Sequence, residues 1–526
     1  MSSSWPGPGF QPVAPPPPPP PAPRSTASGW LLGGVIVAVL VVVAVGAFVL
    51  LPPPPGPTDP TAAPTATATD MAVVTAAPSP TAGTPSATVG TPSPTIGTPS
   101  PTFTASPSPT TPSPSPTAPG PTQSPDATAT PPLSGQTLPP EITAQIDEVV
   151  AQVPPLRELE PLRDVPYRLL TREQLQSELE QMFEEDVDLD HLATEERLLK
   201  RMGLVPPDAN LHELLLDLYG ASIAAYYRPD TGAFYVVERA EPFGPLDRTI
   251  VAHEYTHALQ DQHFDLEGTR VTDLAEGDAA LAQLAVTEGD ATQLMFLWAF
   301  EHLTFAEQVE MLSGSVSQTD PDMMADMPPI LVRQLEFPYT DGFVFAGALF
   351  EQGGWAAIDE AIRTPPPSTE QILHPAKYFA GEQPVAVVPA DRAAALGDGW
   401  QRVYSQVFGE LNVHVWVAAG EPAAEPTTPG MPPPLPYAEV AAGWGGDRMH
   451  MYENSAGDWA IVWATAWDSD TDATEFLGRA RDLLPTLDGV AAVERVPSPV
   501  AGEPDRVVLL IASDRATLDR LGGRRG

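Results

Sequence analysis

The chain contains no cysteine and few basic residues. The absence of cysteine excludes disulfide bonds, thiolate-ligated zinc and catalysis by a thiol. Lysine and arginine together number 26, against 68 aspartates and glutamates, which gives a formal net charge of -42. Nucleic-acid binding needs a basic patch that releases counterions, and the sequence has no cluster of Lys and Arg. Nucleic acid is therefore not an expected partner, and the acidic surface is expected to be well solvated.

Proline is present in large excess, with 67 residues in 526 positions, and it is concentrated before residue 140. Residues 1–29 form a Pro-rich head, and residues 52–137 are rich in Pro, Thr, Ser and Ala. The second stretch repeats GTPSATV, GTPSPTI and GTPSPTF over residues 83–103. Neither composition can build a packed core, so both stretches are predicted to be disordered. The longer one is expected to act as an extended stalk.

Between these stretches, residues 30–51 are uncharged and almost wholly apolar. A helix that spans a bilayer needs about 20 such residues. A cleaved signal peptide would have a shorter apolar region behind a short basic head, so an uncleaved anchor in the lipid bilayer is favoured. Arg24 is the only basic residue near either end, and the positive-inside rule then predicts a cytoplasmic N-terminus. The rest of the chain is expected outside the cytoplasm, on a single-pass membrane anchor.

Regular periodicity begins near residue 138, and residues 138–395 are predicted to form one domain. Apolar residues at helical spacing predict helices in residues 142–153, 172–182 and 211–218. Two runs rich in β-formers, residues 224–228 and 233–238, flank the turn Pro-Asp-Thr-Gly and predict a β-hairpin. Helical patterns return over residues 247–300 and continue to about residue 361. Helices and strands are thus segregated rather than alternating, which is typical of an α+β fold.

Residues 396–526 are predicted to form a small C-terminal α+β subdomain. Short runs with strand character occur at residues 413–417, 458–467 and 506–512. Residues 474–484 carry a helical pattern and separate the last two of these runs.

Three of the histidines fall close together in the segment TIVAHEYTHALQDQHF, residues 249–264. His253 and His257 are four residues apart, so on a helix both imidazoles face the same side and can reach one metal ion. Glu254 projects about 100° away from His253, beside that ion, where it can accept a proton from a water molecule that the metal activates. Asp247 is a plausible N-cap for this helix. The motif predicts one catalytic zinc ion.

A catalytic zinc site needs a third protein ligand, and the residues offer more than one. His263 follows His257 by six residues, the metzincin spacing, but Gln260 stands where that motif has a helix-breaking glycine. On a continuing helix, six residues correspond to about 600°, so His263 points away and is expected to support or pack near the site. Two E-G-D-A units follow, at Glu276 and Glu288. Glu288 lies well inside the next helical run and is favoured, with Glu276 as the alternative.

Acidic residues of the same two units are candidates for a supporting role. Ligating histidines usually donate their other ring N–H to a carboxylate or carbonyl. Asp290 and Asp278 follow Glu288 and Glu276 by two residues and could accept such a hydrogen bond. Both are equally well explained as solvated acids on a helix.

Four segments carry a resemblance to a known family: HEYTHALQDQHF, the downstream EGDAT, PPPSTEQILHPAKY at residues 365–378 and AAGWGGDRMHMY at residues 441–452. Together they resemble a bacterial family of gluzincin-type metallopeptidases, over roughly residue 140 to the C-terminus. The resemblance implies a zincin-like fold, in which a mixed sheet is combined with active-site helices. It also implies zinc held by His253, His257 and Glu288, with Glu254 as the catalytic base.

Further roles at such a site have weaker candidates. A zinc peptidase needs a donor for the oxyanion that develops on the scissile carbonyl. His374, Tyr378 and Tyr339 are candidates for this role, although each is better explained as a packing or surface residue. The strand at residues 234–237 precedes the motif helix, and in gluzincins an edge strand there pairs with the extended substrate.

The sequence as a whole therefore predicts a membrane-anchored extracytoplasmic zinc metallopeptidase that hydrolyses peptide bonds in a peptide or protein substrate. One alternative is a non-catalytic, stalked cell-surface binding module that keeps a zincin fold, although such a module would not require Glu254. Another is a stalked structural protein in which the motif is accidental. Residues 140–246 either build the fold or inhibit the site as a propeptide does, and the fold is favoured because the hairpin belongs in a zincin sheet.

Overall fold

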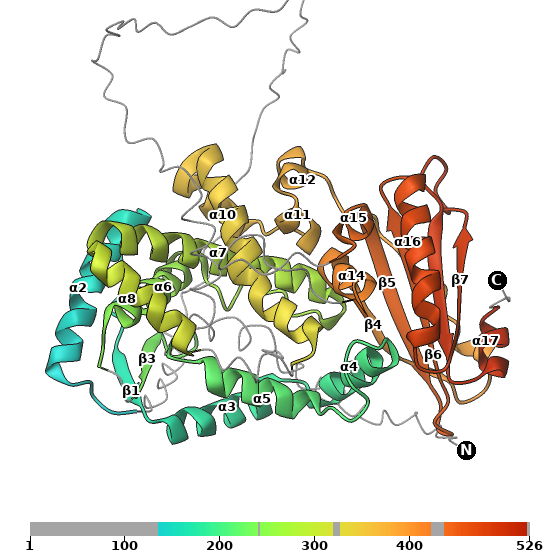
Figure 1. Cartoon of the computed structure of the whole chain (residues 1–526), viewed down its shortest axis with the longest axis horizontal. Coiled ribbons are helices and arrows are strands. Elements are labelled where there is room, and N and C mark those ends of the chain that lie inside the picture. The colour runs from blue at the N-terminus through green and yellow to red at the C-terminus, as the bar shows by residue number, and fades with distance from the viewer. Residues whose placement is uncertain (1–134, 240–241, 319–326, 422–435, 523–526) are drawn as a thin grey trace, which may run out of the picture. The chain divides into compact units, whose positions relative to one another are not determined.

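The computed structural model describes residues 135–239, 242–318, 327–421 and 436–522, all within one compact unit (Figure 1). The predicted head, the apolar run at residues 30–51 and nearly all of the predicted stalk lie outside these residues. Within the described residues, none of the helices combines the length and apolar character that crossing a bilayer requires. The described part is a mixed α+β structure, as the sequence predicts.

The first part of the described chain is mainly helical and contains a small sheet. The N-terminal helix α2 spans Pro140–Arg157, and the two helices that matter most for the site are α6, Pro245–Phe264, and α7, Gly277–His302. The remaining elements of this part are β1 (Tyr167–Leu170), α3 (Arg172–Asp186), α4 (Leu189–Arg201), α5 (Leu211–Ser222), β2 (Ala225–Arg228), β3 (Ala233–Val237), η1 (Leu274–Glu276), α8 (Phe305–Gln318), α10 (Pro329–Arg363), α11 (Thr369–Leu373) and α12 (Pro375–Ala380).

The small sheet has the strand order β1-β3-β2. β2 and β3 pair antiparallel, which confirms the predicted hairpin, whereas β1 pairs parallel to β3. The strand β3 is therefore hydrogen-bonded on both sides, and the expectation that residues 234–237 form a free edge strand is wrong. β1 and β2 are the two edge strands of this sheet, and β2 packs against α6.

The helix α6 begins earlier than the motif suggests. Pro245 occupies its first turn, where a missing N–H is tolerated, and Gly244 precedes it. Asp247 is therefore not the N-cap. Its carboxylate oxygen Oδ2 instead accepts a hydrogen bond of 2.7 Å from the backbone N–H of Gly244, which ties down the start of the helix.

The helices α7 and α10 pack closely enough to need glycine at their crossing. A Cβ atom added to Gly289 would overlap the backbone of Gly342, and one added to Gly342 would overlap the backbone of Ala285. The long helix α10 bends near Gly353 and Gly354, where the backbone leaves helical values. The close crossing brings α10 against the segment of α7 that carries Glu288.

The second part is built on a five-stranded sheet with the order β4-β5-β6-β8-β7. The predicted strands near residues 458–467 and 506–512 are confirmed, as is the helix near residues 474–484. The elements are α13 (Ala393–Leu396), β4 (Gln401–Gln406), α14 (Gly409–Val417), α15 (Ala438–Ala441), β5 (Trp444–Glu453), β6 (Trp459–Trp467), α16 (Asp470–Leu483), η2 (Leu484–Thr486), β7 (Val490–Val496), β8 (Arg506–Ala512) and α17 (Arg515–Leu521).

The predicted strand at residues 413–417 is wrong, because these residues end the helix α14. Val413, Val415 and Val417 alternate along the sequence, which favours a strand. Trp416, which lies between two of them, is just as buried, with its ring 5.1 Å from that of Trp463. A short helix surrounded by packing partners can therefore use β-branched residues, since tertiary packing outweighs their local preference.

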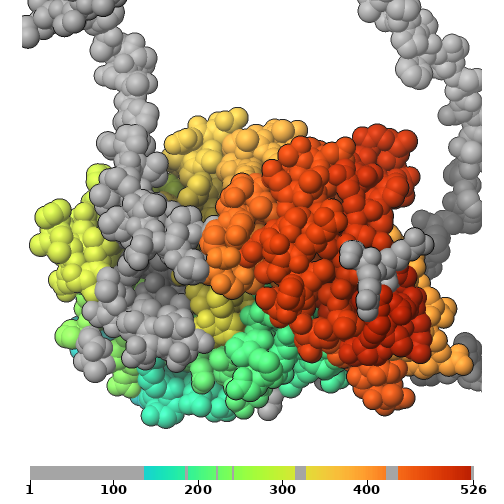
Figure 2. All heavy atoms as spheres, turned by 45° about the vertical axis from the view of Figure 1, so that its right-hand side comes forward, coloured from blue at the N-terminus to red at the C-terminus, as the bar shows by residue number. Residues whose placement is uncertain are grey.

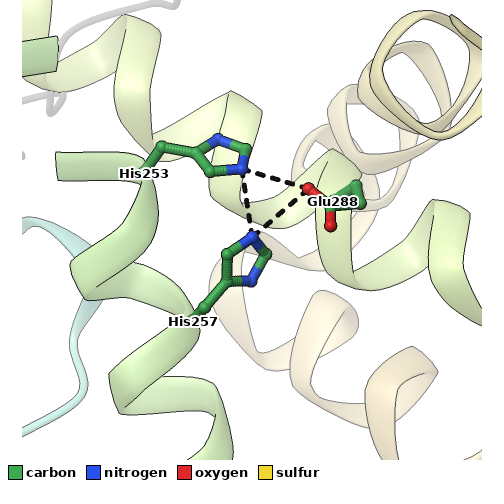
Figure 3. A group of neighbouring side chains, drawn as sticks. All are labelled: His253, His257 and Glu288. Carbon is green, nitrogen blue, oxygen red and sulfur yellow. Dashed lines mark hydrogen bonds and ion pairs between the residues drawn. The ribbon is translucent and has the colours of Figure 1, made fainter. Parts of the chain in front are cut away.

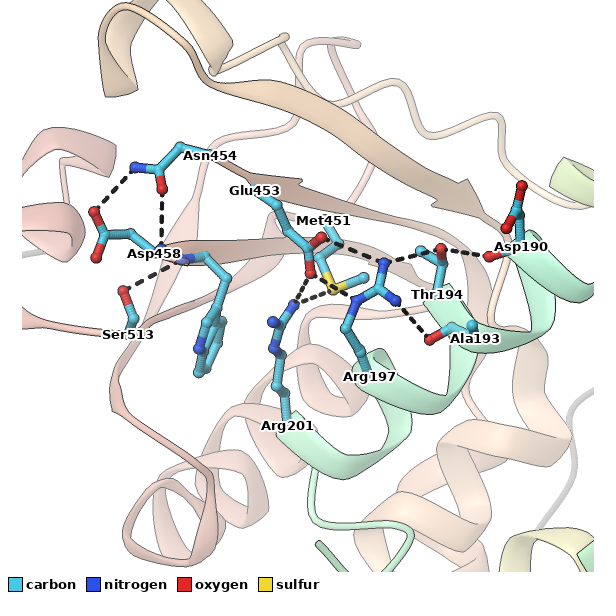
Figure 4. A network of polar contacts seen from close by, with 11 residues as sticks. Asp190, Ala193, Thr194, Arg197, Arg201, Met451, Glu453, Asn454, Asp458 and Ser513 are labelled. Carbon is cyan, nitrogen blue, oxygen red and sulfur yellow. Dashed lines mark hydrogen bonds and ion pairs between the residues drawn. The ribbon is translucent and has the colours of Figure 1, made fainter. Parts of the chain in front are cut away.

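The two parts pack directly on each other, as the spheres in Figure 2 show for the green helical residues and the orange and red C-terminal ones. Arg201 of α4 donates to Glu453 of β5 over 2.7 Å, and Arg197 donates to the same carboxylate over 3.0 Å (Figure 4). The Arg201 guanidinium also lies 4.6 Å from the ring centre of Trp459. On the other side of the contact, Arg448 of β5 donates to Glu276 over 2.7 Å.

Candidate metal centre

Two histidines of α6 and one glutamate of α7 converge at the centre of the helical part (Figure 3). The Nε2 atoms of His253 and His257 are 3.0 Å apart. The Glu288 oxygen Oε2 lies 3.0 Å from His253 Nε2 and 3.2 Å from His257 Nε2. The spacing of the two histidines brings both rings to one side of α6, and packing of α7 on α6 supplies the carboxylate.

The triangle formed by these three atoms fits a tetrahedral metal ion. Zinc binds nitrogen and carboxylate oxygen at about 2.0–2.1 Å, so two ligand atoms of a tetrahedral site are about 3.3–3.4 Å apart. The observed separations of 3.0, 3.0 and 3.2 Å are slightly shorter than this. An outward shift of a few tenths of an ångström would seat the ion with one coordination position left for water. Two imidazoles and a carboxylate are also a donor set that zinc prefers.

Charges within the group are strongly coupled. Burial lowers the pKa of His257, but the adjacent carboxylate of Glu288 outweighs this effect and the pKa rises to about 9. Burial lowers the pKa of His253 to about 4. Burial also raises the pKa of Glu288, yet the two imidazoles reverse the effect and hold that pKa below its ordinary value. The group therefore combines an ionised carboxylate with a positive charge, and a bound cation could supply that charge instead of a proton.

Glu254 is fully buried beside this group. One carboxylate oxygen, Oε2, accepts a hydrogen bond of 2.9 Å from the backbone N–H of Tyr227 in β2. The other oxygen, Oε1, has no hydrogen-bond partner among the described residues. Burial raises the pKa of Glu254 well above its ordinary value, partly opposed by the positive charge on His257. A carboxylate with one oxygen held and one available is suited to accept a proton.

His257 is oriented by a hydrogen bond on its other nitrogen. Gln260 directs its amide nitrogen at two acceptors, Thr287 O at 3.0 Å and Asp290 Oδ2 at 2.7 Å. The amide oxygen therefore faces His257 Nδ1, at 2.8 Å, and can only accept. It follows that Nδ1 carries a proton, which leaves Nε2 directed at His253 and Glu288. Asp290, expected from the sequence as a supporting acid, reaches the histidine through Gln260 rather than directly.

Asp290 is itself held by an arginine from the N-terminal helix. Arg157, the last residue of α2, donates from Nε to the two Asp290 oxygens over 2.8 and 3.1 Å. Its Nη2 atom donates to Asp359 of α10 over 2.6 Å, and its guanidinium lies 4.6 Å from the ring centre of Trp355. The Arg157 side chain is fully buried. Buried charges need such paired, hydrogen-bonded partners to offset the loss of water.

His253 has a different environment from His257. Its ring stacks on Tyr339 of α10, with centroids 6.0 Å apart and planes inclined by 27°. Its Nδ1 atom is buried and has no hydrogen-bond partner within the described ranges. Tyr339 is one of the candidate oxyanion donors, and the structure brings its ring beside a candidate metal ligand.

The competing candidates for the third ligand lie elsewhere. Glu276 forms its ion pair with Arg448 at the contact with the C-terminal sheet. His263 is exposed, and its Nε2 atom lies 2.7 Å from the backbone oxygen of Glu160. Asp278, considered as a supporting acid, is buried against Thr369, which donates its hydroxyl to Asp278 over 2.6 Å. None of these three belongs to the group that could hold a metal ion with His253 and His257.

The two weaker catalytic candidates form contacts of their own. His374 lies between α11 and α12, and its Nε2 atom is 2.8 Å from Glu410 of α14. Tyr378 of α12 packs edge-on against Phe345, with ring centroids 5.1 Å apart. Lys377, between them in sequence, donates to Asp468 over 2.6 Å and pairs with Glu370. The segment STEQILHP and the helix α12 that follows it thus contact α7, α10 and the C-terminal part.

Three residues with a role in the geometry are not identified by the sequence analysis: Gln260, Arg157 and Tyr227. Gln260 follows His257 by three residues and so shares its helix face, which is a local signal for a contact. Arg157 is one of only 26 basic residues in the chain, but nothing in the sequence associates it with Asp290. Tyr227 contributes a backbone N–H, which any residue but proline would supply.

Comparison with known proteins adds one match. A family model described as a domain of unknown function (DUF8575) matches residues 396–521, which begin where the C-terminal subdomain is predicted to begin. No curated protein and no solved structure matches the chain. The match covers the five-stranded sheet and leaves α6 and α7 outside it.

Proposed function

We propose that the protein is a zinc-dependent metallopeptidase of the gluzincin type, with zinc held by His253, His257 and Glu288. One observation carries this proposal: two imidazole nitrogens and a carboxylate oxygen, all buried, lie within 3.2 Å of one another at the spacing of a tetrahedral site. The finer fold assignment, a zincin-like domain, belongs to the same proposal. It is supported by a motif helix packed against both the sheet and the helix that carries the glutamate.

The reaction proposed is hydrolysis of a peptide bond by water. Zinc, when bound, would polarise the scissile carbonyl and lower the pKa of a water molecule. Glu254 accepts the proton of that water through its available oxygen Oε1 and returns it to the leaving amine. The hydrogen bond from Tyr227 to Oε2 keeps the carboxylate oriented during both transfers. His257 stays directed at the metal because its Nδ1 proton is engaged by Gln260.

Glu254 also favours an enzyme over a zinc-binding module without activity. Such a module needs the three ligands but has no use for a buried carboxylate beside them. Burying an acid without a full set of partners costs stability, and groups of this kind concentrate where catalysis requires them. The positions of Glu254 and its available oxygen therefore support a hydrolase.

The location and substrate class in the proposal rest on the sequence alone. The apolar run at residues 30–51 would anchor the chain in a bilayer, and the Pro-rich stalk would present the catalytic part outside the cytoplasm. The substrate would be a peptide or protein.

The proposal is tested by the zinc content of the full-length chain and of two variants, His257→Ala and Glu288→Ala. We expect one zinc ion per chain in the wild type and none in either variant. Glu276→Ala is the matched control, because it removes the glutamate of the other E-G-D-A unit, and it should keep its zinc. Cleavage of a peptide library by the wild type, abolished by chelation and restored by zinc, would complete the assignment. A wild type that takes up no zinc after reconstitution would contradict it.

A further inference from the structure

The helix α2 ends at a residue that reaches the interior of the candidate site. Arg157 is separated from Asp290 by more than a hundred residues in sequence, yet the two side chains form a fully buried ion pair. From Asp290 the hydrogen bonds continue to Gln260 and then to His257 Nδ1. The chain of contacts links the N-terminal helix to one of the two histidines of the motif.

We propose that Gln260, Asp290 and Arg157 are positioning residues that hold the His257 imidazole in the tautomer and orientation needed to bind metal. The inference rests on the proposed zinc function and deepens it. Gln260 contacts the histidine directly, whereas Arg157 acts indirectly by holding the Asp290 carboxylate in place. Ligating histidines depend on such partners, and losing the partner typically weakens metal binding about 10–100-fold.

The side chains of Arg157, Asp290 and Gln260 have few alternative ways to form these hydrogen bonds. Asp290 cannot turn away from Gln260 without leaving Arg157, because its Oδ2 atom accepts from both residues. Gln260 cannot reverse its amide, since its nitrogen would then face the histidine and its oxygen would face a carboxylate and a carbonyl. In the observed orientation both N–H groups of the Gln260 amide have acceptors, and His257 Nδ1 must donate to the amide oxygen.

The segment before the motif contributes to the candidate site through Arg157 of α2. A propeptide that inhibits an enzyme is removed to release activity, and its contacts block the site rather than build it. Arg157 instead contributes to the support of a ligand, with Asp359 and Trp355 of α10 enclosing its guanidinium. The helix α2 therefore helps to support the metal centre, and loss of its contact with Asp290 should weaken metal binding.

The matched pair Gln260→Leu and Gln283→Leu tests the central residue. Gln283 is also a buried glutamine whose amide bonds to two backbone groups, Thr269 O and Val271 N, but it has no link to His257. In the full-length chain we expect the zinc dissociation constant to rise about 10–100-fold for Gln260→Leu and to stay unchanged for Gln283→Leu. Equal zinc affinity in Gln260→Leu and the wild type, or equal losses in both variants, would overturn the proposal.

The outer residue is tested with Arg157→Lys, which keeps the charge but replaces the planar guanidinium, whose Nε and Nη2 contact Asp290 and Asp359, with a single nitrogen. Gln152→Leu is its control, because Gln152 also connects α2 to α7, through Trp298 at 3.0 Å, without touching this chain of contacts. Arg157→Lys should weaken zinc binding and Gln152→Leu should not. The opposite order would contradict a role for α2 in the site.

A spectroscopic measurement separates this proposal from the proposed function. Nitrogen chemical shifts of histidine-labelled, metal-free protein report whether His257 Nδ1 carries a proton that is hydrogen-bonded. We expect that signal in the wild type and in Gln283→Leu, and its loss in Gln260→Leu. A wild type that binds no zinc would refute the peptidase proposal, whereas the absence of the hydrogen-bonded Nδ1 proton would refute the positioning role.

Discussion

Asp447 in the C-terminal part and Glu254 and Glu288 in the helical part are all buried carboxylates, but their oxygens have different numbers of hydrogen-bond partners. In the C-terminal sheet, Asp447 accepts from the backbone N–H groups of Phe408 and Gly409 and from Trp463 Nε1 at 2.6 Å. In the helical part, Glu254 and Glu288 each have an oxygen with no partner among the residues the structure describes. A buried acid whose oxygens all accept hydrogen bonds stabilises a fold. One whose oxygen lacks a partner can bind a ligand or accept a proton.

The largest expected effect is on catalytic activity, which should distinguish Glu254 from Asp447. Glu254→Gln removes the proposed base, and general-base catalysis typically contributes a factor of about 10²–10⁴ in rate. Peptide hydrolysis by this variant should fall by that amount while zinc content stays at one per chain. Asp447→Asn, the same acid-to-amide change in the other part, should keep wild-type activity per folded molecule. Wild-type turnover by Glu254→Gln would contradict the assignment of the base.

The same two variants should also differ in stability, because only Asp447→Asn is expected to be destabilised. Asp447→Asn replaces one acceptor oxygen with an NH₂ group that faces an N–H donor, and losing a hydrogen bond to a charged group costs about 1.5–3 kcal/mol. Glu254→Gln keeps an oxygen for the Tyr227 N–H and removes a buried acid that lacks a full set of partners, so the metal-free variant should be at least as stable as the wild type. Denaturant titration of metal-free protein measures the free energy of unfolding of both variants. Equal losses of stability would contradict the proposed difference between Asp447 and Glu254.

The helix crossing that brings α10 to the site offers a third comparison, between two glycines. Gly289→Ala inserts a methyl group into the backbone of Gly342 and should cost about 1–3 kcal/mol despite the better helix propensity of alanine. Gly347→Ala on α10 meets nothing nearer than Gln293 Oε1 at 3.8 Å and should be neutral or stabilising by up to about 1 kcal/mol. Thermal unfolding would show the difference, and a tolerated Gly289→Ala would mean that the crossing is looser than described.

A further comparison concerns the pH dependence of stability at the contact between the two parts. Burial raises the pKa of Asp278 from an ordinary value of 3.8 to about 7, with the charges of Asp447 and Glu410 adding to the rise. A raised pKa in the folded state gives stability that is full below the unfolded value and is lost as pH rises through the folded value. The free energy of unfolding should therefore decrease between about pH 4 and pH 7.

The comparison is between Asp278→Asn and Asp398→Asn, a change at an exposed acid. Melting temperatures across that pH range should depend less on pH in Asp278→Asn than in the wild type, whereas Asp398→Asn should follow the wild type. Identical pH dependence in all three proteins would show that Asp278 does not titrate in this window.

Prediction from sequence was accurate where the signal was local. The hairpin before the motif, the helix around residues 474–484 and the strands near residues 458–467 and 506–512 all follow from periodicity and turn residues. The N-terminus of α6 was misplaced because Asp247 can cap a helix or stand three residues inside one, and both arrangements satisfy a backbone N–H. The helix at residues 409–417 was missed because its valines alternate, and burial on several sides hides the helical period.

The sequence by itself determined the pair His253 and His257, because a spacing of four residues on a helix directs both rings to one side whatever surrounds them. It also limited the candidates for the third ligand to two glutamates and one histidine. Only the tertiary structure brought Glu288 rather than Glu276 to that pair, joined Arg157 to Asp290 and Gln260, and placed β3 in the middle of the sheet rather than at an edge. These outcomes depend on how helices and strands pack across long separations in sequence, which local periodicity does not encode.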